Sequence, residues 1–133
     1  MADVELRYRL ALVTGAGTTL GREVAVRLGR AGAGVLAADP DTAAAQETAR
    51  LVRERRVWAA SVQVDTHVEA DVRLLAARVH DLGGVALVVD AAGGSYDAFL
   101  RDLLAQEGEP RWVDAATLSR LGGRGAIGLL RAG

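Results

Sequence analysis

A glycine-rich turn and an aspartate further along the chain are the residues of this sequence whose types and spacing best suit a binding site. The turn runs Thr14-Gly15-Ala16-Gly17-Thr18-Thr19-Leu20-Gly21, between an apolar run and a helical pattern. Glycines let a backbone approach a phosphate closely, and a helix start offers free N–H groups and the positive end of its dipole. Asp39 follows Gly21 by 18 residues and ends the next apolar run. Its carboxylate could accept both hydroxyls of an adenosine ribose and would repel a 2′-phosphate. The pattern predicts a dinucleotide site; a plain tight turn and a strand-ending aspartate are the simpler alternative.

Four other side chains could carry acid–base chemistry. Asp90 should lie at the carboxyl edge of a central strand, where burial could raise its pKa, or where local backbone N–H groups could hold it as an ordinary carboxylate. Tyr96 could act as an acid in the same crevice or pack as an aromatic residue at a helix start. His67 is expected in a solvated loop, and His80 near a helix C-terminus, without the carboxylate pattern of a metal site.

Apolar runs alternate with helical patterns along the chain, which is typical of right-handed βαβ crossovers and a parallel sheet. We therefore predict an α/β fold over residues 1–133, a single doubly wound parallel sheet of five strands in the order 3-2-1-4-5. The predicted strands are Tyr8–Thr14, Gly34–Asp39, Val57–Val64, Val85–Val89 and Ala126–Leu130. The predicted helices are Gly21–Ala31, one capped by Asp41 and running to about Arg56, one opened by a Thr66/Glu69 capping box and ending at Gly83-Gly84, Ser95–Gln106 with Phe99, Leu100, Leu103 and Leu104 inward, and Trp112–Leu121.

Composition narrows the class of protein. The chain has 133 residues, half of them hydrophobic, a net charge of −1 and no cysteine, which excludes disulfides and thiol chemistry. All 16 basic residues are arginine, a composition typical of a GC-rich bacterial genome. No basic cluster favours nucleic acid, and no secretory leader or membrane-length apolar run is visible, so we expect a cytoplasmic protein without nucleic-acid or membrane partners.

From about Arg9 to Gly94 the sequence resembles the short-chain dehydrogenase/reductases. The resemblance rests on the Thr-Gly-x-x-x-Gly-x-Gly turn, on Asp39, on Asp65 after the third strand, and on a counterpart of the Asn-Asn-Ala-Gly motif after the fourth. It implies a Rossmann-like fold and a nicotinamide cofactor, NAD rather than NADP because of Asp39. The positions that would bind the cofactor are Gly15, Thr18, Thr19, Leu20, Gly21, Asp39, Asp65, Thr66, Ala92 and Gly93.

Two departures from the family pattern predict weak NAD binding. Thr19 stands at the second motif glycine, where a β-branched residue restricts the backbone and places a side chain toward the pyrophosphate. The Asn-Asn-Ala-Gly motif has become Asp90-Ala91-Ala92-Gly93, which replaces two amides and introduces a carboxylate.

The absence of the family's catalytic residues is the larger departure. Family members use a Tyr-x-x-x-Lys pair, a preceding serine and an asparagine, and this chain contains neither lysine nor asparagine. The segment Gly125–Leu130 resembles the family's fifth strand, after which the domain is expected to be truncated. We therefore expect a degenerate relative, a pseudoenzyme rather than an independent oxidoreductase, with its catalytic residues unknown. It would act through weak dinucleotide or small-molecule binding, or through assembly.

Two alternative functions stay open. The chain could be a small enzyme that reuses the crevice for isomerase or cyclase chemistry, or a reductase subunit completed by a partner chain. Apolar residues over 95–130 predict a homodimer, or a hetero-complex with a full-length relative, because they would otherwise be exposed.

Overall fold

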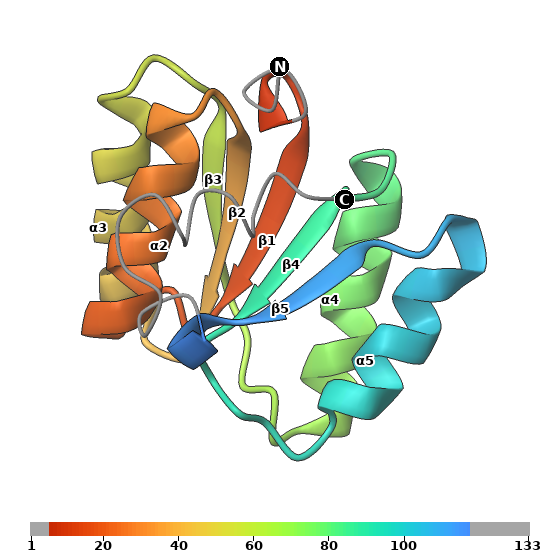
Figure 1. Cartoon of the computed structure of the whole chain (residues 1–133). Coiled ribbons are helices and arrows are strands. Elements are labelled where there is room, and N and C mark those ends of the chain that lie inside the picture. The colour runs from red at the N-terminus through yellow and green to blue at the C-terminus, as the bar shows by residue number, and fades with distance from the viewer. Residues whose placement is uncertain (1–5, 118–133) are drawn as a thin grey trace.

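Five parallel strands form a single sheet in the order β3-β2-β1-β4-β5, in a computed structural model that describes residues 6–117 (Figure 1). The strands are β1 (Leu10–Thr14), β2 (Gly34–Asp39), β3 (Ala59–Gln63), β4 (Leu87–Asp90) and β5 (Arg111–Asp114). The helices are α2 (Thr19–Arg30), α3 (Thr42–Arg53), α4 (Glu69–Asp81) and α5 (Asp97–Leu104), followed by the short 3-10 helix η1 (Ala105–Glu107). The predicted fold class and strand order are confirmed.

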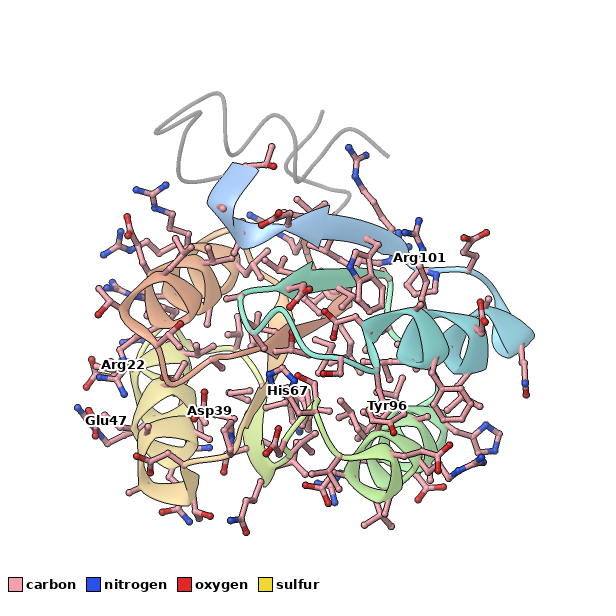
Figure 2. All side chains as sticks on the ribbon, turned by 90° about the horizontal axis from the view of Figure 1, so that it is seen from below. Arg22, Asp39, Glu47, His67, Tyr96 and Arg101 are labelled. Carbon is pink, nitrogen blue, oxygen red and sulfur yellow. The ribbon has the colours of Figure 1, made fainter. Side chains whose placement is uncertain are left out.

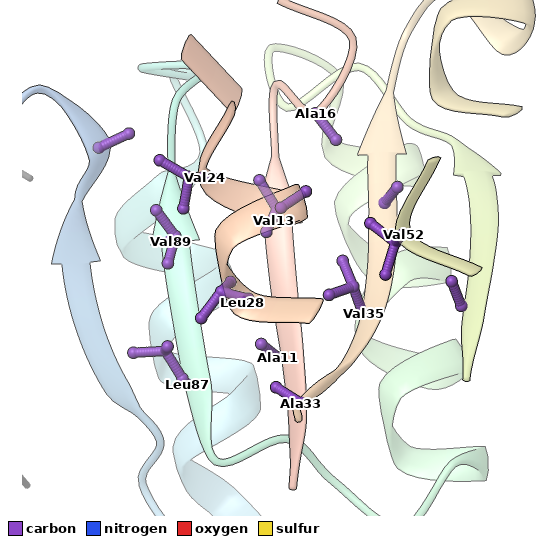
Figure 3. Close-up of a cluster of buried hydrophobic side chains, with 14 of the residues drawn as sticks. Ala11, Val13, Ala16, Val24, Leu28, Ala33, Val35, Val52, Leu87 and Val89 are labelled. Carbon is purple, nitrogen blue, oxygen red and sulfur yellow. The ribbon is translucent and has the colours of Figure 1, made fainter. Parts of the chain in front are cut away.

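The sheet is covered on both faces, as its apolar strands require. Helices α2 and α3 lie on one face, and α4 and α5 lie on the other (Figure 1). Figure 3 shows the first of these layers, in which Val24 and Leu28 of α2 pack over Val13 and Val89 of the central strands. Because the helices occupy the faces, the loops after the strands meet at the carboxyl edge of the sheet.

The register brings three strand ends to the same level. Thr14, the last residue of β1, pairs with Ala38 of β2 on one side and with Asp90 of β4 on the other. The segments that follow these strands therefore start side by side, which positions any site at this edge.

Helix starts agree with the sequence in one case and differ in another. Asp41 is the N-cap of α3, and its side chain accepts a hydrogen bond from the amide of Ala44 at 3.1 Å, as predicted. The predicted Thr66/Glu69 capping box is wrong, because α4 begins at Glu69 after Val68, without a side-chain cap. Thr66 is instead 4% exposed and packed against Gly94, so tertiary packing takes the side chain that the spacing assigned to a cap.

The fifth strand comes from a segment that we predicted to be helical. Residues Arg111–Asp114 form β5, with Val113 buried toward the α2 and α3 layer and Trp112 packed against the α4 and α5 layer. This alternation has period two, the pattern of a strand covered on both faces. The helix predicted over Trp112–Leu121 is therefore wrong for its first residues. The strand predicted at Ala126–Leu130 lies outside the described residues.

Helix α5 buries its apolar stripe within the chain. Leu100 and Leu104 are buried, while Phe99 and Leu103 are partly buried against the same cluster. No helix in the described part of the chain is both long enough and apolar enough to cross a membrane.

Candidate functional site

The glycines of the turn after β1 are required by contacts inside the chain. Gly15 has a φ of +69°, and a Cβ built on it would lie 2.7 Å from the carbonyl carbon of Ala91. A Cβ on Gly21 would collide with the carbonyl oxygen of Gly15. The turn is thus pressed against the segment that follows β4, and these two glycines would be needed even without a ligand.

The start of α2 leaves two backbone donors open. Thr18 is the N-cap, and its hydroxyl accepts from the amide of Gly21 at 3.0 Å and donates to the carbonyl of Gly15 at 2.7 Å. The amides of Thr19 and Leu20 donate to no acceptor in the described part of the chain. Two N–H groups at the positive end of a helix dipole form a suitable place for an anion.

Thr19 affects the anion site at the start of α2 differently from what we predicted. It is the first residue of α2, exposed and helical, and its φ is not positive. A β-branched residue is therefore accommodated without backbone strain, which corrects the expectation of a restricted backbone. What remains is the side chain, which stands beside the open amides.

Asp39 is turned toward the glycine-rich turn and is only 6% exposed. Its Oδ1 accepts from the amide of Gly17 at 3.0 Å, and its Oδ2 accepts from the amide of Asp41 at 2.9 Å. Each carboxylate oxygen has a second lone pair, so the group can still accept ribose hydroxyls. Gly17 belongs to the motif, but it was missing from the predicted binding residues; its bond to Asp39 could not be read from spacing.

Arg22 is the cation in the first turn of α2, and its guanidinium is already hydrogen-bonded to residues of α3. Its Nε donates to the hydroxyl of Thr48 at 2.9 Å, and its Nη2 donates to the carbonyl of Ala44 at 3.1 Å. The Thr48 hydroxyl in turn donates to the carbonyl of Ala16 at 2.7 Å. This chain of bonds fastens α3 to the turn and holds the guanidinium against α3.

Asp90 ties the end of β4 to the end of β1 and to its own loop. Its Oδ1 accepts from the hydroxyl of Thr14 at 3.0 Å and from the amides of Ala92 and Gly93 at 2.9 and 3.0 Å. Burial acts to raise the pKa of Asp90, but hydrogen bonds from Asp97, Gly93, Ala92 and Thr14 together hold it below its ordinary value. The raised pKa that we considered for Asp90 is therefore wrong, and the alternative of a carboxylate held by local amides is confirmed.

The raised pKa belongs to Asp97, the first residue of α5. Burial, a hydrogen bond to Asp90 and repulsion by the charge of Asp90 raise the pKa of Asp97 to about 7. Asp97 is not evident as a functional residue from the sequence, because an acidic residue in the first turn of a helix is common and needs no partner. Only the folded loop brings Asp97 back to the end of β4.

The loop between β3 and α4 is fastened to the loop between β4 and α5. The carbonyl of Thr66 accepts from the amide of Tyr96 at 3.0 Å, and Asp65 Oδ1 accepts from the amide of His67 at 2.9 Å. The Nδ1 of His67 lies 3.1 Å from the amide of Ser95 and 2.7 Å from its hydroxyl. Because the Ser95 amide can only donate, this network assigns a lone pair to Nδ1 and the ring proton to Nε2. His67 is exposed, as predicted, but it bridges two loops, and Ser95 is the partner that the sequence did not reveal.

Tyr96 packs as an aromatic residue at the start of α5. Its ring meets Phe99 edge-on, with 6.5 Å between centroids and an interplanar angle of 71°. The guanidinium of Arg73 lies 4.8 Å from the centroid of Phe99 on the same cluster. This arrangement favours the packing alternative over an acid role.

The predicted binding residues are gathered at one edge of the molecule. Figure 2 looks onto this carboxyl edge, with Asp39 beside α3, His67 near the middle and Tyr96 beside α5. The residues placed here are Gly15, Thr18, Thr19, Leu20, Gly21, Asp39, Asp65, Thr66, Ala92 and Gly93. Among the described residues no three histidine or acidic side chains converge as metal ligands. A separate groove of about 700 Å3, lined by residues such as Leu10, Ala86 and Leu104, opens at the opposite, amino edge.

The profile of the short chain dehydrogenase family matches residues 9–114 of this chain. The chain belongs to this family. The (3R)-3-hydroxyacyl-CoA dehydrogenase of Rattus norvegicus is a relative that is 40% identical over 108 residues, which are 74% of this chain and 42% of that protein. The present chain therefore spans less than half the length of that curated protein.

Two solved structures share the fold of this chain. A hydroxysteroid dehydrogenase from Escherichia coli superposes with a TM-score of 0.72 at 27% identity, over 80% of this chain and 52% of that one. An NAD+-bound xylitol dehydrogenase superposes with a TM-score of 0.60 at 29% identity, over 64% of this chain and 33% of that one. The second of these structures thus contains bound NAD+ on a fold that it shares with this chain.

Proposed function

We propose that this chain binds NAD weakly at the carboxyl edge of its sheet and does not reduce carbonyl compounds on its own. The observation that carries the proposal is the pairing of Asp39 with the glycine-rich turn. A carboxylate with free lone pairs lies next to a helix start with open amides, and a dinucleotide needs both.

Different residues at this edge would bind different parts of the cofactor. The amides of Thr19 and Leu20 would hold the pyrophosphate at the start of α2, and Asp39 would accept the hydroxyls of the adenosine ribose. Asp65 and Thr66 would border the adenine, and Ala92 and Gly93 would pass beside the riboses. NAD supplies a nicotinamide that accepts or donates hydride; these residues would bind and orient it.

The charges at this edge favour NAD over NADP. Asp39 would repel a 2′-phosphate, and Arg22 is held by Thr48 and Ala44, so it is turned to α3 rather than offered to a phosphate. Replacing Asp39 with serine should therefore raise the affinity for 2′-phospho-ADP-ribose relative to ADP-ribose. An unchanged ratio of the two dissociation constants would contradict the assigned role of Asp39.

Two features support weak binding. The Thr19 side chain stands beside the open amides, where the family has a glycine, and desolvating it costs affinity. The ionised carboxylate of Asp90 lies beside Ala92 and Gly93, and it uses their two amides as hydrogen-bond donors. Those amides are then not offered to a ligand.

The 133 residues lack the family's acid and its activating cation. Carbonyl reduction in the family needs a tyrosine whose pKa is lowered by a lysine four residues later, and this chain contains no lysine. We expect no oxidation of NADH or NADPH by the purified chain with ketone or 3-oxoacyl substrates. Steady turnover that co-purifies with the chain and disappears in the Asp39→Ser variant would overturn this part of the proposal.

Assembly is the second candidate function, and the edge of the sheet supports it. In the described part of the chain β5 is paired on one side only, by β4, and unpaired strand edges invite a partner. Trp112 of β5 and Leu103 of α5 belong to the same apolar cluster and are only partly buried. We propose that a second copy of this chain, or a full-length relative, covers this edge of β5 through contacts made within residues 95–130.

A further inference from the structure

Two carboxyl groups face each other at the end of β4 with no cation to separate them. Asp90 and Asp97 share a hydrogen bond, and neither forms an ion pair with any described residue. The Oδ1 of Asp97 is shielded from solvent and has no hydrogen-bond partner among the N–H and O–H groups of the described residues. Two ionised carboxylates in this arrangement would repel each other, whereas one proton between them supplies the missing donor.

The three other donors to Asp90 decide where that proton resides. Thr14, Ala92 and Gly93 all donate to Oδ1 of Asp90, which stabilises Asp90 as the ionised member. The proton therefore resides on Asp97, which donates it to Asp90. The assignment agrees with the buried Oδ1 of Asp97, which has no other hydrogen-bond partner among the described residues.

We propose that Asp90 and Asp97 form a latch of one shared proton, which fastens residues 91–96 across the carboxyl edge and opens when the proton is lost as pH rises. Asp97 begins α5 and Asp90 ends β4, so their contact closes the loop between these elements at its base. Gly15 packs directly against Ala91 and Ala92, so the same loop forms one wall of the glycine-rich turn.

The latch responds to pH in the neutral range. Burial and the neighbouring Asp90 raise the pKa of Asp97 to about 7, above its ordinary value of 3.8. Between these two values the folded chain keeps a proton that the unfolded chain has released, so each rise in pH disfavours folding. The contribution is largest near the ordinary value and is gone once pH exceeds about 7.

Other charged groups near the pair must be separated from its effect. The loop after β3 carries Asp65 and His67, and β5 ends in Asp114, the register partner of Asp90, whose Oδ1 accepts from the amide of Ala116. Arg73 of α4 and Arg101 of α5 lie over the aromatic rings of Phe99 and Trp112 rather than on the carboxyl groups. His67 accepts a hydrogen bond from the Ser95 amide within the same loop cluster, so His67 is the neighbouring imidazole that the test must control for.

The test compares thermal unfolding from about pH 5.5 to about pH 8.5 in matched variants without any ligand. For the unmodified chain we expect a midpoint about 5 °C lower at the alkaline end. Asp97→Asn should remove this dependence, because an amide donates to Asp90 at every pH. Asp90→Asn should do the same, and it serves as the second variant if Asp97→Asn does not fold. Asp102→Asn, an exposed change on the same helix, should follow the unmodified chain. His67→Asn introduced into every variant controls for the neighbouring imidazole.

A second readout observes the carboxyl group directly. The side-chain carboxyl carbon of Asp97, followed by NMR, should titrate near neutral pH in the unmodified chain and at a lower pH in Asp90→Asn. Titration of Asp97 near its ordinary value, or thermal curves of Asp97→Asn that run parallel to those of the unmodified chain, would overturn the latch.

The consequence for ligand binding rests on the proposed NAD site. If NAD binds there, its affinity should fall about threefold or more from about pH 6 to about pH 8.5 in the unmodified chain and stay level in Asp97→Asn. Because the unfolding and NMR measurements need no ligand, a chain that binds no NAD but shows the shared proton would refute the proposed function and leave the latch intact.

Discussion

The amide of Gly17 lies 3.0 Å from Oδ1 of Asp39, so the carboxylate at the end of β2 holds the turn that follows β1. A Cβ on Gly17 would lie 2.8 Å from the Asp39 carboxyl carbon, which shows how closely the two segments are packed. The Asp39 side chain therefore stabilises the turn and, in the proposed complex, accepts hydrogen bonds from the ribose hydroxyls.

Replacing Asp39 should weaken both roles by amounts that depend on the substitute. Asp39→Ala leaves the amides of Gly17 and Asp41 without acceptors and should lower the free energy of unfolding by about 3 kcal/mol. Asp39→Asn keeps one acceptor for Gly17 and should cost about half as much. Urea unfolding of both variants measures the difference. Equal stability of the alanine variant and the unmodified chain would show that Asp39 does not hold the turn.

Two glycines with the same backbone conformation provide a matched pair. Gly15 and Gly93 have φ values of +69° and +64°, but a Cβ on Gly15 meets Ala91 whereas a Cβ on Gly93 meets nothing within 4 Å. Gly93→Ala should cost only the left-handed conformation, about 1 kcal/mol, and Gly15→Ala should cost about 2 kcal/mol more because its neighbour is backbone. Unfolding free energies of similar size for the two variants would mean that the contact between the turn and the loop after β4 is not formed as described.

The part of the fold that was predictable from sequence is the part whose signals are local. The apolar run Gly34–Asp39, stopped by Pro40, has the bounds of β2, and Asp41 caps the next helix because its side chain reaches only its own backbone. Strand β5 was not predictable, because four residues with one tryptophan and one valine show period two only when a helix layer exists on each side.

The site divides in the same way. The glycine-rich turn and Asp39 could be recognised from residue types and spacing, because the fold places strand ends at one edge. The pairs Asp90–Asp97 and His67–Ser95 could not, since each joins segments whose contact depends on how the loop after β4 is packed. Thr66 illustrates the limit of local signals: it has the spacing of a helix cap, but in the fold it packs against Gly94 instead.

Thr19→Gly should tighten NAD binding severalfold, because it removes the side chain beside the open amides at the start of α2. The loss of helix propensity should cost less than about 1 kcal/mol of stability. Thr18→Ala is the neighbouring control: it removes the N-cap and should cost about 1 kcal/mol without improving affinity. Fluorescence or calorimetric titration measures both variants. An affinity that does not change in Thr19→Gly, while NAD binding is measurable, would place the pyrophosphate elsewhere.

Assembly can be tested by charge introduction at the proposed contact. Leu103→Asp and Trp112→Asp should convert an oligomer to monomers, because both are partly buried apolar side chains within the proposed contact. Leu74→Asp is the control, since Leu74 is 69% exposed on α4 and lies outside residues 95–130. Light scattering gives the masses, and urea unfolding confirms that each variant is folded. A monomer at high concentration before any substitution would refute the homodimer.

The central claim is that this chain retains an NAD site, and calorimetric titration of the purified chain with NAD and with NADP at about pH 6.5 tests it most directly, since the proposed latch is then closed. We predict saturable binding of NAD with a dissociation constant of about 0.1 to 1 mM, at least tenfold weaker binding of NADP, and loss of the NAD signal in Asp39→Ala. Tighter binding of NADP than of NAD, or no heat with NAD at concentrations of about 10 mM, would contradict the account.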